Sequence, residues 1–222
     1  MRKQIVRIFH NIRGKVNSSS GQSKEDVQPA ADLSAQESYL WDGEDSGGVN
    51  ERSGSEPMAA ADQDGFLRLL ERKDFEKIVN ENLGVAGKQG CLLIGDVDRF
   101  REINDIYGHD MGNAVLKYVV NVLLDTFEEC EYIARQGSDT FAMWLSGVSP
   151  EQEDQLRMQA GKVNDRLLHP AVELPPVTLS IGIAYGGSGE DCRSLGRKAV
   201  KALNRVKESG RCGCEVYDRI RG

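Results

Sequence analysis

Apolar residues follow two different spacings along the chain from residue 64 onward. Helical spacing, with apolar positions recurring about every three or four residues, covers the ranges 66–79, 113–127, 150–168 and 194–208. Short apolar runs typical of strands occupy 91–97, 132–145, 177–184 and 215–217, and a polar turn interrupts the second run. Strands that alternate with helices around a central hairpin predict an α/β fold, in which helices cover a mixed sheet.

The hairpin over 132–145 is the most informative part of this pattern. Gly137 and Ser138 favour a tight turn, and Asp139 follows directly after the tip. A second acidic cluster, Asp-Val-Asp at 96–98, ends the strand that begins at residue 91. If this strand and the hairpin are neighbours in the sheet, their carboxylates converge where a metal-bound phosphate would lie.

The first 60 residues differ in composition from the rest of the chain. Over 1–16, Ile, Phe and Val recur at helical spacing among five Lys and Arg residues, which predicts a basic amphipathic helix. Such a helix suits an anionic membrane surface or a groove on a protein partner, and a frayed tail with a chance apolar stripe is the alternative. Residues 17–60 are rich in Ser, Gly, Asp and Glu, which predicts a disordered acidic linker.

Charge, cysteine usage and hydropathy argue against several classes of protein. The net charge of −7 disfavours general nucleic-acid binding, which needs a basic face. Five scattered cysteines, without a complete set of zinc ligands, favour a reduced, cytosolic protein. No apolar run is long enough to cross a membrane, and no signal peptide is evident. We therefore expect a cytoplasmic protein, peripheral at the inner membrane if residues 1–16 bind lipid.

Polar residues elsewhere in the second part of the chain are candidates for nucleotide binding. Asn104 and Asn113 carry amides able to pair with a base edge, and the glycine-rich turn predicted before the long helix offers backbone donors to phosphate. Lys207 and Arg211 flank Gly210 at the end of the last helix, which suits the clamping of a terminal phosphate. Each group also has an ordinary explanation, as loop residues, turn residues or a helix C-cap.

Four short motifs follow one another in this part of the chain. They are Asp-Val-Asp-Arg-Phe-Arg-Glu-Ile-Asn-Asp-Ile-Tyr-Gly-His-Asp-Met-Gly-Asn at 96–113, Arg-Gln-Gly-Ser-Asp-Thr-Phe at 135–141, Val-Thr-Leu-Ser-Ile-Gly-Ile-Ala at 177–184 and Lys-Glu-Ser-Gly-Arg at 207–211. In this order they resemble the signatures of GGDEF domains, the diguanylate cyclases of bacterial second-messenger signalling. The resemblance covers about residues 62–218. It implies a nucleotidyl cyclase-like fold, in which helices cover a mixed, mainly antiparallel sheet with a signature β-hairpin.

The resemblance also implies an activity and a set of site residues. Each domain would bind one GTP with Mg²⁺, and two domains in a homodimer would join their GTP molecules into cyclic di-GMP. By position, the metal ligands would be Asp96, Asp139 and the Val97 carbonyl. The catalytic hairpin would be Gly137, Ser138, Asp139 and Thr140. The substrate-binding residues would be Phe100, Asn104, Asn113, Lys207 and Arg211, of which Asn104 reads guanine and the last two hold the γ-phosphate.

The chain departs from the family pattern at three of these positions. Ser138 replaces a glycine and adds a side chain where the backbone approaches phosphate. Thr140 replaces a glutamate that helps to activate the attacking hydroxyl or to hold metal, and a threonine is neither a carboxylate base nor a strong Mg²⁺ ligand. Asn113 replaces an aspartate, so the charge-assisted hydrogen bond to guanine is lost.

These departures leave three hypotheses for the function. The one we favour is a degenerate GGDEF domain of cyclic di-GMP signalling that keeps a Mg-GTP pocket, is inactive or strongly impaired as a cyclase, and acts as a regulatory or interaction module. The second is an active diguanylate cyclase with a relaxed signature, because metal ions and positioning supply most of the catalysis of phosphoryl transfer. The third is a scaffold that binds no nucleotide and is tethered by residues 1–16.

Overall fold

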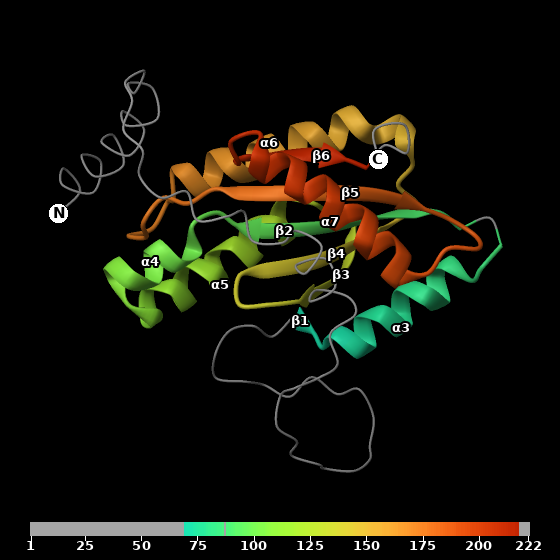
Figure 1. Cartoon of the computed structure of the whole chain (residues 1–222), viewed down its shortest axis with the longest axis horizontal. Helices are drawn as coiled ribbons and strands as arrows, with labels where there is room; N and C mark the ends of the chain where they lie inside the picture. The colour runs from blue at the N-terminus through green and yellow to red at the C-terminus, as the bar shows by residue number, and fades with distance from the viewer. Residues whose placement is uncertain (1–68, 87, 218–222) are drawn as a thin grey trace, which may run out of the picture. The chain divides into compact units, whose positions relative to one another are not determined.

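A six-stranded mixed sheet forms the centre of the domain in the computed structural model, which describes residues 69–86 and 88–217 (Figure 1). The strands are β1 (Leu69–Leu70), β2 (Gly90–Val97), β3 (Cys130–Arg135), β4 (Thr140–Ser146), β5 (Leu179–Gly186) and β6 (Gly213–Val216), in the spatial order β1-β3-β4-β2-β5-β6. The four central strands pair antiparallel, whereas β1 runs parallel to β3 and β6 runs parallel to β5. The predicted α/β fold with a mainly antiparallel sheet is confirmed.

Helices cover both faces of this sheet (Figure 1). They are α3 (Arg72–Leu83), α4 (Phe100–Tyr107), α5 (His109–Thr126), α6 (Glu153–Leu168) and α7 (Cys192–Glu208), with the short 3-10 turn η1 (Pro150–Gln152) before α6. Apolar side chains of α3 and α7 form one buried cluster with Leu92, Ile94 and Trp144. The alternate residues Cys91 and Leu93 of β2 are buried as well, because α5 and α6 cover the opposite face. This explains why β2 reads as a continuous apolar run.

Two predictions of local structure are wrong. Leu69 and Leu70, predicted inside the opening helix, form β1 because they pair with β3, and the helix begins only at Arg72. The stretch after β2, predicted as a glycine-rich turn, forms α4 and the first turn of α5, because Phe100 and Ile103 bury an apolar helix face there. The predicted helix at 1–16, the linker at 17–60 and the start of the opening helix at 66–68 lie outside the described residues.

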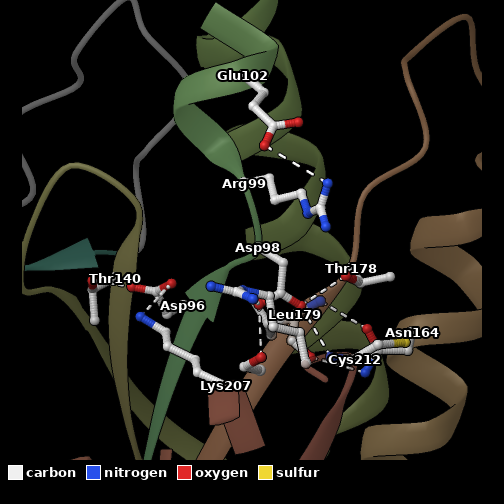
Figure 2. Close-up of polar contacts among 12 residues, drawn as sticks. Asp96, Asp98, Arg99, Glu102, Thr140, Asn164, Thr178, Leu179, Lys207 and Cys212 are labelled. Atoms are coloured by element: carbon white, nitrogen blue, oxygen red, sulfur yellow. Dashed lines mark hydrogen bonds and ion pairs between the residues drawn. The ribbon is translucent and has the colours of Figure 1, made fainter. Parts of the chain in front are cut away.

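Two close contacts fix the helices relative to the centre of the sheet. A Cβ at Gly182 of β5 would lie 2.0 Å from the Ala199 carbonyl oxygen, so α7 lies directly on this strand. On the other face, the Asn164 amide of α6 donates to the Leu179 carbonyl (3.0 Å) and accepts from the Leu179 N–H (2.7 Å). The C-terminal end of α7 lies near the end of β2, where Lys207 contacts Asp96 (Figure 2).

Candidate functional site

The end of β2 lies beside the signature hairpin. In the β2–β4 register Asp96 is opposite Thr140, and in the β2–β5 register it is opposite Ser180. The N–H of Val97 donates to the Asp139 carbonyl oxygen at 3.1 Å, which continues the pairing into the hairpin turn. The two acidic segments of the sequence are therefore brought together, as the pattern of strands predicts.

The Asp96 carboxylate has a partner for each oxygen (Figure 2). Its Oδ1 lies 2.9 Å from the Lys207 ammonium, and its Oδ2 accepts a hydrogen bond from the Thr140 hydroxyl at 3.0 Å. Burial raises the pKa of the Asp96 carboxyl; the positive charge of Lys207 opposes this rise and the negative charge of Asp139 adds to it. The residue predicted to hold γ-phosphate is thus the counter-ion of a residue predicted to hold metal.

The hairpin turn is held from within by hydrogen bonds. Arg135 donates from Nε to the Gly137 carbonyl (3.0 Å) and from Nη2 to the Ser138 carbonyl (2.5 Å). The Ser138 hydroxyl, absent where the family has glycine, donates to Asp139 Oδ1 at 2.8 Å. The negative charge of Asp139 lies close enough to raise the pKa of the Asp96 carboxyl. Both changed signature residues, Ser138 and Thr140, therefore donate to the acidic groups of the site.

Phe100, Asn104 and Gly112 form a second group, where α4 packs against α5. A Cβ at Gly112 would lie 2.0 Å from Asn104 Oδ1 and 3.1 Å from Phe100 Cζ, so only glycine leaves room for both side chains. Asn104 Oδ1 is enclosed and has no hydrogen-bond partner in the described part of the chain. A buried acceptor without a partner suits a ligand that supplies a donor, such as the edge of a base. Asn113 is exposed on α5.

The two predicted phosphate-binding cations lie near different carboxylates. Lys207, in the last turn of α7, contacts Asp96, whereas Arg211 Nε lies 4.0 Å from Asp98 Oδ1 and its side chain is 45% exposed. Asp98 is a site residue that the sequence reasoning passed over, because its partners come from distant segments. The signal that would have found it is the second acid of the Asp-Val-Asp cluster together with the two hydroxyls of Thr178 and Ser180.

The donor types at the end of β2 suit a hard divalent cation. Carboxylates and a peptide carbonyl are the oxygen ligands that Mg²⁺ prefers, and Asp96, Asp139 and Val97 supply them. Within residues 69–86 and 88–217, no group of three or more His, Cys, Asp or Glu side chains is arranged to hold a metal ion by itself. A cation at Asp96 would share this carboxylate with Lys207 or displace Lys207 from Oδ1.

Comparison with known proteins identifies the family. The family model described as "Diguanylate cyclase, GGDEF domain" matches residues 61–212. Diguanylate cyclase DgcM of Escherichia coli (strain K12) is 31% identical in an alignment of 160 residues that covers 68% of this chain and 37% of that protein. The chain thus spans little more than a third of the length of such curated relatives.

Solved structures show the same fold. The GGDEF domain of DgcB from Caulobacter crescentus, in complex with c-di-GMP, has a TM-score of 0.62 at 23% identity and covers 74% of this chain and 99% of its own. The active GGEEF domain of a diguanylate cyclase from Vibrio cholerae has a TM-score of 0.60 at 25% identity and covers 68% and 99%. The chain belongs to the GGDEF domain family. No helix among the described residues has the length and hydropathy needed to span a membrane.

Proposed function

We propose that this protein is a degenerate GGDEF module of bacterial cyclic di-GMP signalling, which keeps a pocket for Mg-GTP and is strongly impaired as a cyclase. The observation that carries the proposal is the hydrogen bond of 3.0 Å from the Thr140 hydroxyl to Asp96 Oδ2. In a GGDEF signature this position holds a glutamate, and a second carboxylate facing Asp96 would need a cation between the two. Threonine removes that need, because its hydroxyl carries no negative charge and donates a hydrogen bond to Asp96 directly.

The loss of the glutamate also removes a proton acceptor. The buried Thr140 hydroxyl is committed to Asp96 and is too weakly basic to take a proton from an attacking 3′-hydroxyl. Loss of general acid–base help lowers a rate by about 10²–10⁴-fold. Ser138 adds to the impairment, because its hydroxyl occupies one oxygen of Asp139 at 2.8 Å.

The residues predicted to bind nucleotide support a retained pocket. Asn104 offers an enclosed oxygen to a base, and Lys207 and Arg211 supply positive charge at the end of α7. Mg²⁺, when bound, would be held by Asp96, Asp139 and the Val97 carbonyl, and would neutralise phosphate charge. Lys207 would then leave Asp96 for the phosphates, which are the stronger counter-charge.

The proposal predicts that the purified full chain, incubated with GTP and Mg²⁺, forms no cyclic di-GMP detectable by chromatography. A known diguanylate cyclase in parallel serves as the positive control. Thr140→Ser keeps the hydroxyl and is expected to behave like the wild type, whereas Thr140→Glu is expected to strengthen the Mg²⁺ dependence of GTP binding measured by calorimetry. Clear formation of cyclic di-GMP by the wild-type chain would overturn the proposal that the domain is impaired as a cyclase.

The same measurements separate the two other candidates. An active cyclase with a relaxed signature is favoured by the 31% identity to a protein named a diguanylate cyclase, and turnover in the assay would establish it. A scaffold that binds no nucleotide would give a flat GTP titration. With a retained pocket, Asp96→Ala weakens Mg²⁺-dependent GTP binding, and an effect of this substitution excludes the scaffold.

A further inference from the structure

Asp98, the carboxylate that follows β2, is buried, and both of its oxygens accept hydrogen bonds from the protein itself. The residue is 6% exposed, and its N–H donates to the Thr178 carbonyl at 2.9 Å. Its Oδ1 accepts from the Ser180 hydroxyl (2.7 Å), and its Oδ2 accepts from the Thr178 hydroxyl (2.7 Å) and from the N–H of Cys212 (3.1 Å). Both oxygens are thus engaged within the protein, and the side chain is 3% exposed.

The Cys212 contact ties this carboxylate to the turn that follows α7. Gly210 has a φ of 109°, and the N–H of Arg211 bonds to the Val206 carbonyl at 2.9 Å, which is the Schellman ending of a helix. The next two residues stay in the left-handed region, Arg211 with φ 68° and Cys212 with φ 56°. Residues other than glycine rarely adopt this conformation, so the surrounding structure has to hold it.

Asp98 is one of the groups that hold this conformation. It fixes the Cys212 N–H on one side of the turn, and its Oδ1 lies 4.0 Å from the Arg211 guanidinium on the other. The carboxylate itself is fixed by two hydroxyls at the start of β5, so the turn is joined to the centre of the sheet (Figure 2). Lys207 lies four residues before Arg211 on the same segment and two residues before the C-cap Ser209.

We propose that Asp98 is a positioning residue for the terminal phosphate of a bound nucleotide. By holding the turn at 209–212, it sets the direction of Arg211 and the end of α7 that carries Lys207. It acts through these cations and does not touch the ligand. The inference rests on the proposed function, because it assumes that a nucleoside triphosphate occupies the pocket.

Asp98→Asn is the informative substitution because it keeps the size of the side chain. If the amide nitrogen stood at the place of Oδ2, two donors, the amide and the Cys212 N–H, would face each other. The amide nitrogen therefore has to stand at the place of Oδ1, beside Ser180 and Arg211. The Ser180 hydroxyl can rotate to accept, but the guanidinium cannot accept and loses its counter-charge. The turn is therefore loosened on the side of Arg211, whereas the sheet keeps its hydrogen bonds.

The test compares GTP with GDP binding to the full chain by calorimetry with Mg²⁺. We expect the wild type to bind GTP more tightly than GDP, and Asp98→Asn to weaken GTP binding by about tenfold, the effect of one charge-assisted contact to phosphate. GDP binding should change by less than about twofold, because the terminal phosphate is absent. Gln159→Ala is the control for general destabilisation, since Gln159 is buried and bonds to Thr126 and Glu129, away from the turn.

A double-mutant cycle tests the route through Arg211. In an Arg211→Ala background, Asp98→Asn should have no further effect on the ratio of GTP to GDP affinity. If Asp98→Asn fails to fold, Thr178→Val is the substitute, because it removes one hydrogen-bond donor from Oδ2 and keeps the negative charge of Asp98. It should lower the ratio of GTP to GDP affinity about threefold. An unchanged ratio, or an equal loss for both nucleotides as in the Gln159→Ala control, would refute the positioning role. A wild type that binds GTP and GDP equally also refutes it, and one that binds neither refutes the proposed function as well.

Discussion

Thr140 illustrates how the contacts of a single residue depend on the register of the strands. The sequence alone shows that a threonine stands where the signature has glutamate, and it predicts the loss of a base. That the hydroxyl points at Asp96 follows only from the pairing of β2 with β4. Asp98 is a related case: the sequence shows this acid and the hydroxyls of Thr178 and Ser180, but only the fold shows that these hydroxyls and the Cys212 N–H share it as their acceptor.

Cys192 gives a test at the same scale. It is fully buried at the start of α7, and burial raises the pKa of its thiol to about 12. An unfolded thiol titrates near pH 8.5, so between about 8.5 and 12 the folded state keeps a proton that the unfolded state has lost. The contribution of the thiol to stability is complete below this window and falls by about 1.4 kcal/mol per pH unit within it.

The measurement is urea unfolding of the wild type and Cys192→Ala between pH 8 and 11. Other titrating groups cancel in the comparison, so any advantage of the wild type over the variant should shrink as the pH rises. A constant difference across the series would mean that the thiol ionises equally well in both states.

At the scale of elements, the sequence predicted most strands and helices and failed where tertiary pairing decided. β2, the hairpin, α6, β5 and α7 lie within a few residues of their predicted ranges. β1 was missed because its two leucines also fit a helical stripe, and only β3 makes them a strand. α4 was missed because Gly108 and Gly112 read as a turn, although Gly112 serves close packing inside α5.

The contact between α7 and β5 yields a prediction of stability. In Gly182→Ala the new methyl group would meet the Ala199 carbonyl oxygen at 2.0 Å and the Leu203 nitrogen at 2.4 Å, both backbone atoms that cannot rotate away. We expect a loss on the order of 3 kcal/mol in the free energy of unfolding, because α7 must shift from the sheet. The matched control is Gly161→Ala on the exposed face of α6, where nothing lies within 4 Å. That variant should gain about 0.5–1 kcal/mol from helix propensity, and a similar result for both would contradict the close packing.

At the scale of the whole molecule, the chain combines a GGDEF domain with an N-terminal segment that lies outside the described residues. We predict that deletion of residues 1–16, which carry five Lys and Arg and no acidic residue, changes the distribution of a fluorescently tagged chain in cells. Deletion of residues 42–57, a stretch of equal length in the predicted linker, is the control. An unchanged distribution after the first deletion would remove the tether from consideration.

The hydrogen bonds of Asp98 also bear on the order in which the chain assembles. Its side-chain partners lie 80, 82 and 114 residues further along the sequence. When β2 has been synthesised, the Asp98 carboxylate therefore has none of its hydrogen-bond donors from the protein. It stays hydrated until β5 and the segment after α7 have been synthesised. Contacts between segments so far apart form slowly, because a long loop must close first. The turn that carries Arg211 is consequently among the last parts of the domain to take shape, and a nascent chain that stops before residue 212 has a sheet in which this anchor is missing.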